Sequence, residues 1–173
     1  MMMKKRNITE SAEVFYRIKR GLSGYVSYLA ACEMNPSFSE YLLYEPILRI
    51  LTARGFRVEC EVECPGISQP NTGDKKRLDF VARKKGLTLA VEVKWAKKSR
   101  PEIKADVDKL TACLGAEKQW RAFLIVFGTK SSICRLLLSE GLFKERGKMR
   151  IADLGKTKYG CRVYELAESA ARR

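Results

Sequence analysis

Two carboxylates and a lysine are the residues of this chain whose types and spacing best fit a chemical site. Asp79 precedes Glu92 by thirteen residues, and Lys94 follows in the segment Glu-Val-Lys. Carboxylate oxygens are hard ligands that suit Mg²⁺ or Mn²⁺. On a largely buried sheet such charges cost too much free energy unless they pair with each other or bind a metal. These three residues therefore indicate either internal ion pairing or a divalent metal site.

The three residues fall on two predicted strands, Arg77–Arg83 and Leu87–Trp95, joined by a Lys-Lys-Gly turn. Side chains two positions apart share one face of a strand, so Glu92 and Lys94 point the same way. The apolar residues of the second strand point to the opposite face: Leu89, Val91, Val93 and Trp95. On the first strand, Leu78 and Phe80 form one set, and Arg77, Asp79 and Val81 form the other. Pairing as a hairpin would bring Asp79 beside Glu92 and Lys94.

The chain contains no histidine, which narrows the chemistry available to this site. Ser-His-Asp and Cys-His catalysis, His-ligated zinc hydrolysis and a histidine general base are all excluded. The charge balance is also one-sided, with 34 Lys and Arg against 20 Asp and Glu, a net charge of +14. This excess favours a polyanionic partner, with nucleic acid ahead of an anionic membrane surface.

The six cysteines include no Cys-x-x-Cys pair, so free thiols are favoured over a disulfide or zinc framework. Cys60 and Cys64 fall on the apolar face of a predicted strand, and Cys113 and Cys134 lie in helical patterns, which predicts burial. No apolar stretch approaches the roughly 20 residues of a membrane span, and no hydrophobic segment follows the basic start. These features predict a cytoplasmic, reducing setting without membrane binding.

Helical and extended patterns alternate along the rest of the 173 residues. Residues 1–8 are predicted to be a frayed tail, followed by a helix from Glu10 to about Glu33 that is interrupted near Gly21 and Gly24. The other predicted elements are a helix from Ser37 or Ser39 to Arg54, a strand Phe56–Cys64, a loop Pro65–Lys76, a helix Pro101–Leu114, a strand Arg121–Gly128 covered on both faces, a helix from Ser131 or Ser132 to about Ser139, and two final strands, Lys148–Leu154 and Cys161–Leu166. This order predicts an α/β domain with a mixed sheet.

An acidic helix start, then Asp79, then Glu92-Val93-Lys94, resembles the motif of the PD-(D/E)xK nuclease superfamily. Small restriction-type endonucleases and archaeal Holliday-junction resolvases are the most similar groups, and the resemblance covers roughly residues 39–128. It includes the order of elements and the segment Asp106–Leu110. One departure is Leu78, which stands where a proline often precedes the aspartate. The resemblance implies a restriction-endonuclease-like core within residues 37–173. The order of predicted elements adds an N-terminal helical extension in residues 1–36 and a C-terminal β-hairpin formed by the last two strands.

The same resemblance implies roles for individual residues in a nuclease that cleaves phosphodiester bonds, with DNA favoured. Asp79 and Glu92 would bind Mg²⁺ or Mn²⁺, and the main-chain carbonyl of Val93 would complete that shell. Lys94 would orient or help to deprotonate the attacking water. Glu40 lies on the buried stripe of its predicted helix and is expected to be an additional ligand. Other acids remain open for that position: Glu45, Glu61 and Glu63.

Basic residues flank the predicted site in sequence and are expected to contact nucleic-acid phosphates. They are Lys75, Lys76, Arg77, Lys84, Lys85, Lys97, Lys98 and Arg100. Two other classes of function remain as alternatives: a catalytically inactive nuclease fold that only binds nucleic acid, and an RNA-cleaving or toxin-like nuclease. A homodimer that cuts only when paired is a further expectation, because related small nucleases are often dimers.

Overall fold

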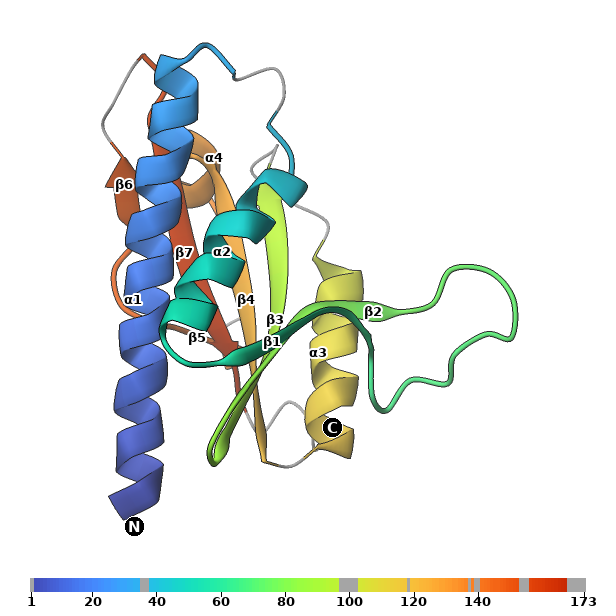
Figure 1. Cartoon of the computed structure of the whole chain (residues 1–173). Helices are drawn as coiled ribbons and strands as arrows, with labels where there is room; N and C mark the ends of the chain where they lie inside the picture. Colours follow the sequence, from blue (N-terminus) through green and yellow to red (C-terminus); the bar gives the residue numbers. More distant parts are fainter. Residues whose placement is uncertain are drawn as a thin grey trace.

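The computed structural model describes residues 2–34, 38–96, 103–117, 119–136, 138, 141–152 and 156–167, and it shows an α/β fold with an open, mixed sheet (Figure 1). The elements in chain order are α1 (Met2–Ala31), α2 (Tyr41–Ala53), β1 (Arg57–Glu63), β2 (Arg77–Lys84), β3 (Leu87–Ala96), α3 (Lys104–Ala116), β4 (Trp120–Thr129), α4 (Lys130–Cys134), β5 (Phe143–Glu145), β6 (Arg150–Ala152) and β7 (Tyr159–Leu166). The predicted fold class, a mixed sheet flanked by helices, is confirmed at this level. No helix within the described ranges has the length and apolar character that crossing a membrane requires.

The seven strands are arranged in the order β1-β2-β3-β4-β7-β5, with β6 also paired to β7. β3 and β4 run parallel and are connected through α3, whereas the other pairs are antiparallel. The predicted hairpin of β2 and β3 is confirmed, and so is the pairing of the last two predicted strands, β6 and β7. β5 was not predicted, because three residues are too short to show an alternating pattern.

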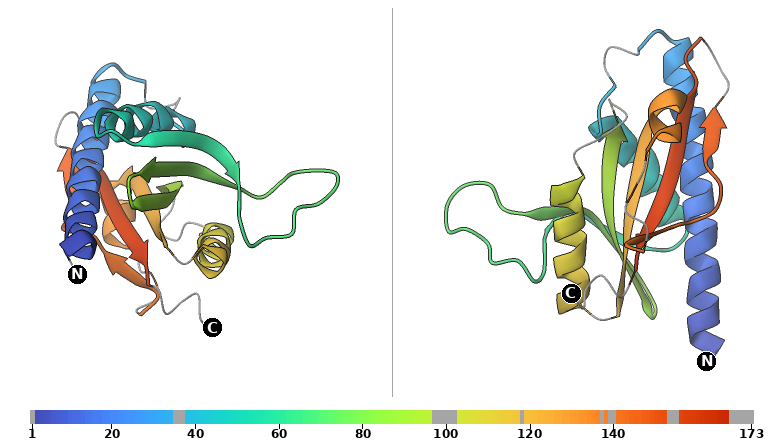
Figure 2. Two further views of the ribbon diagram at one scale, coloured as in Figure 1. Left: turned by 60° about the horizontal axis from the view of Figure 1, so that its bottom comes forward. Right: turned by 180° about the vertical axis from the view of Figure 1, so that it is seen from behind.

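Helices cover both faces of the sheet (Figure 2). α1 and α2 pack on one face, where Phe15, Ile47 and Phe123 belong to one buried cluster. α3 and α4 pack on the other face, where Leu110, Leu124 and Ile133 belong to a second cluster. β4 contributes to both clusters and is buried from Ala122 to Gly128, which confirms the strand predicted from its continuous apolar run.

α1 is longer and more regular than the sequence indicated. The predicted tail of residues 1–8 is helical from Met2, so the helix begins well before the predicted start at Glu10. This segment contains no proline or glycine to stop a helix. No interruption occurs at Gly21, because that glycine serves packing: a Cβ there would lie 2.7 Å from Ile50 Cδ1 of α2. The α1 side chains that face the sheet are fully buried, so this helix forms part of the main core.

Two further predictions about local structure were wrong. α4 ends at Cys134, well before the predicted Ser139, and its cap is Thr129, whose Oγ1 accepts a hydrogen bond from the Ser132 amide. Cys60 and Cys134 are exposed, although their positions in apolar patterns predicted burial; Cys64 and Cys113 are buried as expected. All six cysteines are free thiols, which agrees with the prediction that no disulfide framework is present. Of the two predicted starts of α2, Ser37 lies outside the described residues, and Ser39 precedes the helix, whose N-cap is Glu40 and makes no side-chain cap hydrogen bond.

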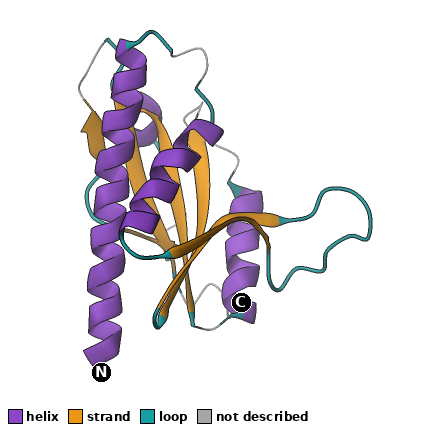
Figure 3. Cartoon of the chain, in the orientation of Figure 1, coloured by secondary structure: helices purple, strands orange, loops and turns teal. Residues whose placement is uncertain are grey.

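The sheet divides at β2. The β2–β3 pairing runs from Lys84↔Leu87 to Phe80↔Val91, whereas β1 and β2 remain paired as far as Glu63↔Arg77. The β1–β2 ribbon therefore leaves the sheet beyond Phe80, and the connecting loop extends away from the body of the molecule (Figure 3). Leu78 consequently packs with the cluster under α3, not on the same side as Phe80 as the alternation predicted. A cavity opens where the two strands separate.

Candidate metal-binding and catalytic site

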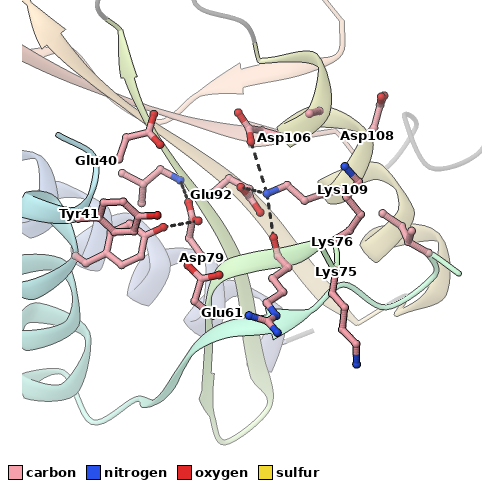
Figure 4. Close-up of a pocket in the computed structure, with 15 residues that line it drawn as sticks. Glu40, Tyr41, Glu61, Lys75, Lys76, Asp79, Glu92, Asp106, Asp108 and Lys109 are labelled. Atoms are coloured by element: carbon pink, nitrogen blue, oxygen red, sulfur yellow. Dashed lines mark hydrogen bonds and ion pairs between the residues drawn. The ribbon is translucent and has the colours of Figure 1, made fainter. Parts of the chain in front are cut away.

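Asp79 and Glu92 lie at the point where β2 separates from β3. Continuing the register past Phe80↔Val91 places these two acids opposite each other, as the hairpin prediction required. Both line a cavity of about 480 Å³, and their carboxylates point into the same region (Figure 4). The sequence prediction that the hairpin brings these carboxylates together is thus confirmed.

Asp79 is held by one side chain and one main-chain group. The Tyr44 hydroxyl of α2 donates to Oδ1 at 2.5 Å, and the Val93 amide donates to Oδ2 at 2.6 Å. Burial raises the pKa of Asp79, and these two hydrogen bonds to the carboxylate only partly oppose that rise. The carboxylate is therefore fixed in position while its charge remains poorly compensated.

Glu92 is almost completely buried, with 1% of its surface exposed. Lys109 of α3 donates to its Oε2 at 2.5 Å, but Oε1 is buried without any hydrogen-bond partner among the described residues. Burial, reinforced by the nearby charge of Asp79, raises the pKa of Glu92 to about 9, even though the Lys109 ammonium opposes the shift. A buried carboxyl group with an unpartnered oxygen and a raised pKa is one that would exchange its proton for a bound cation.

Lys94 lies on the same side of the sheet as Glu92, as the alternation predicted, but contacts other acids. Its Nζ lies 3.5 Å from Glu40 Oε1 and 3.5 Å from Asp106 Oδ2. Burial alone would lower the pKa of Lys94, but the Asp106 and Glu40 carboxylates reverse that effect and raise it. The lysine therefore carries a positive charge at neutral pH, which favours an electrostatic or orienting role over that of a proton acceptor.

Glu40 reaches the cavity from the N-terminal end of α2. Its Oε1 accepts a hydrogen bond of 3.0 Å from the Trp95 amide and also faces Lys94. Of the alternative acids, Glu61 also lines the cavity, opposite Asp79 in the β1–β2 register and with a left-handed φ of 52°. Glu45 is exposed and pairs with Arg49, and Glu63 pairs with Lys75. Of the four predicted candidates for the additional acid, the structure thus leaves Glu40 and Glu61 at the cavity.

The charged side chains form one connected network across β3 and α3. Lys94 contacts Asp106 at 3.5 Å, Asp106 contacts Lys109 at 3.6 Å, and Lys109 contacts Glu92. With Glu40 and Asp79 included, four carboxylates face two ammonium groups.

The predicted basic residues divide into three groups. Lys75, Lys76 and Arg77 line the cavity where the loop returns to β2. Lys84 lies at the other end of β2, where it pairs with Glu10 and donates to the Arg54 carbonyl at 2.8 Å; Lys85 is exposed in the adjacent turn. Neither of these two residues lines the cavity. The remaining three, Lys97, Lys98 and Arg100, lie outside the described residues.

Sequence reasoning gave no role to three residues that hold the site together: Tyr44, Asp106 and Lys109. Tyr44 falls on the buried stripe of its helix, where a tyrosine is normally core. Asp106 and Lys109 stand three positions apart on α3, so they share a helix face, and a helix between two parallel strands must pack on the sheet. That spacing was the available signal, but it does not identify which strand residues they contact.

Without movement of its side chains, the site offers only part of the ligand set that a divalent cation needs. Within the described ranges, no three acidic or cysteine side chains are grouped closely enough to form a ready metal-binding cluster. Two carboxylates, Asp79 and Glu92, share the cavity, and Glu92 Oε1 is free. These two acids could supply two hard oxygen ligands, the ligand type that Mg²⁺ prefers.

Comparison with protein-family models, with curated proteins and with solved structures found no match to this chain.

Proposed function

We propose that this chain is a metal-dependent nuclease that hydrolyses phosphodiester bonds, with DNA as the favoured substrate. The observation that carries the proposal is the convergence of Asp79 and Glu92, two buried acids with raised pKa values, in one cavity. Perturbed acids that converge in a cavity are the usual signature of a functional site. The net charge of +14 supports a polyanionic substrate.

Asp79 and Glu92 are the residues proposed to bind Mg²⁺ or Mn²⁺, with the Val93 carbonyl as a further ligand by the family resemblance. Such a metal, when bound, polarises the phosphate and lowers the pKa of a bound water. The Tyr44 hydroxyl and the Val93 amide keep the Asp79 carboxylate oriented toward the cavity. Preorganised ligands of this kind lower the cost of assembling the site.

Lys94 and Lys109 supply positive charge beside the two acids. Burial alone would lower the pKa of Lys109, but the negative charge of Glu92 raises it by more, so the net shift is upward. Both lysines are therefore ammonium groups at neutral pH and can stabilise negative charge that develops on the phosphate. Lys75, Lys76 and Arg77 at the cavity mouth are proposed to position the nucleic-acid backbone.

The arrangement of elements supports a restriction-endonuclease-like core as part of the same proposal. A helix carrying Glu40, an antiparallel pair carrying Asp79 and Glu92, and a parallel β3–α3–β4 unit follow one another along the chain. This is the order that the motif resemblance implies for residues 39–128.

Two observations favour a second candidate, a nucleic-acid-binding module that does not cut. Lys109 already occupies Glu92 Oε2, and the described residues contain no preformed three-ligand cluster. In this alternative the lysine takes the place of the metal as the counter-charge of Glu92.

Isothermal titration with Mn²⁺ separates the two candidates. The nuclease proposal predicts saturable binding by the wild-type protein that is lost in Asp79→Asn and retained in Glu45→Gln, because Glu45 is exposed outside the cavity. The binding-module candidate predicts no binding that depends on Asp79. Plasmid, single-stranded, branched and RNA substrates, each with Mg²⁺ or EDTA, then identify what is cut.

A further inference from the structure

Two clefts with basic linings border the outer surface of α1, one on the side of α2 and the other on the side of β5 and β6. One, of about 590 Å³, lies between α1 and α2; the other, of about 570 Å³, lies between α1 and the segment 144–150. Tyr16 lines both clefts, and neither shares a residue with the cavity that contains Asp79. We call this region the α1 basic surface. Its charged residues are Glu13, Arg17, Lys19, Arg20, Arg54, Lys144, Glu145, Arg146, Lys148 and Arg150.

A buried lysine fixes the second cleft in place. Lys19 is 3% exposed, and its Nζ donates to the carbonyls of Arg146 at 2.5 Å and Lys148 at 3.0 Å. Gly147 between them has a φ of 69°, and a Cβ at that position would lie 3.2 Å from the Lys19 ammonium. The turn is therefore held against α1 through its backbone, which leaves the side chains of Lys144 and Lys148 exposed.

An arginine is held at the junction of the two clefts. The Arg150 guanidinium lies over the Tyr16 ring, 4.7 Å from its centroid, and the Ser23 hydroxyl donates to the Arg150 carbonyl at 3.4 Å. Stacking on an aromatic ring orients a guanidinium without neutralising it. Arg150 therefore presents an oriented charge on the ridge that α1 forms between the clefts.

Five of the eight basic residues on this surface make no ion pair within the described part of the chain, whereas Arg17 and Arg54 pair with Glu13, and Arg146 pairs with Glu165. The cleft beside the 144–150 segment has five basic residues and one acid, Glu145, whose carboxylate faces Arg162. Three exposed residues make no ion pair within the described part of the chain: Arg20, Lys144 and Lys148. Like charges held this close repel each other, and a polyanion would remove that cost while releasing its own counterions.

We propose that the α1 basic surface binds the phosphodiester backbone of a nucleic acid, at a place separate from the Asp79 cavity. The charges lie on both sides of a helical ridge, so a chain of regularly spaced phosphates can contact more of them than one small anion can. An anionic membrane fits less well, because of the large exposed apolar residues in the described ranges only Tyr16 lines either cleft. The proposal does not depend on cleavage.

Binding of a labelled DNA duplex, followed by fluorescence anisotropy in EDTA over a salt series, tests the surface. The test variant is Lys144→Glu/Lys148→Glu, and the matched control is Lys130→Glu/Lys156→Glu, which changes the net charge equally at two exposed lysines outside both clefts. Loss of two phosphate contacts reduces the slope of log K against log[salt] by about 2, which at roughly 0.1 M salt weakens binding by about 60-fold. The control should keep the wild-type slope.

Equal weakening by the two double variants would overturn the proposal, because it would show a general charge effect. Binding to vesicles of anionic phospholipid that depends on Lys144 and Lys148, without a matching effect on DNA, would overturn it in favour of a membrane surface. Unchanged DNA binding in the test variant, once thermal unfolding has shown that the variant is folded, would also overturn the proposal. Because EDTA prevents any metal-dependent cleavage, these results stand or fall separately from the nuclease proposal.

Discussion

Replacing Glu92 with glutamine should change how the stability of the metal-free protein depends on pH. Glu92 has a pKa of about 9 in the folded chain and 4.5 when unperturbed, so between these values the folded state binds a proton that the unfolded state lacks. Stability from such a group is complete below the unfolded pKa and is lost as pH rises toward the folded one. The loss is about 1.4 kcal/mol per pH unit, or roughly 3 kcal/mol between about pH 5.5 and pH 8. Glu92→Gln keeps the side-chain shape and removes this term.

Urea unfolding in EDTA, followed through the fluorescence of Trp95 and Trp120, measures the effect. The free energies of unfolding of Glu92→Gln and wild type should diverge as pH rises, with the variant relatively more stable at the alkaline end. Glu45→Gln is the matched control, because Glu45 is exposed on α2 and should leave the pH dependence unchanged. Parallel pH profiles for wild type and Glu92→Gln would refute the inference that burial holds a proton on this carboxyl.

Three further predictions concern stability, one at the site and two elsewhere in the fold. Tyr44→Phe removes the 2.5 Å hydrogen bond to Asp79 and should lower the free energy of unfolding by about 1.5–3 kcal/mol, whereas Tyr41→Phe, at a residue that is 76% exposed, should have little effect; equal values in urea unfolding would contradict this. Gly128→Ala places a Cβ 2.6 Å from the Ala96 carbonyl oxygen between β3 and β4 and should cost about 1–3 kcal/mol, visible as a lower Tm. Gly24→Ala meets nothing within 4 Å on α1 and should raise stability by about 0.5–1 kcal/mol; a loss there would show that the helix is strained.

The hairpin that carries Asp79 and Glu92 could be predicted because its signal is local. A two-residue period fixes which strand residues share a face, and a short turn fixes the pairing of β2 with β3. The continuous apolar run of β4 was equally informative, since a short run of this kind is typical of a strand covered on both faces. The sequence therefore predicted which acids meet.

Contacts between distant elements could not be predicted in this way. Lys109 and Asp106 reach Glu92 and Lys94 only because α3 packs across β3, and nothing in a helical period identifies its partner on the sheet. The separation of β2 from β3 turned Leu78 to the other face, which a uniform alternation cannot anticipate. Gly21 of α1 predicted a helix break because it is a glycine, but its role is close packing against Ile50.

Cleavage of DNA by the purified protein in Mg²⁺, compared with Asp79→Asn and with EDTA, tests the central claim most directly. The account predicts cleavage by the wild type that EDTA abolishes, no cleavage by a folded Asp79→Asn, and wild-type cleavage by the control Glu45→Gln. Full activity in Asp79→Asn, or activity that persists in EDTA, would contradict the assignment of Asp79 and Glu92 as the metal-binding acids of a nuclease.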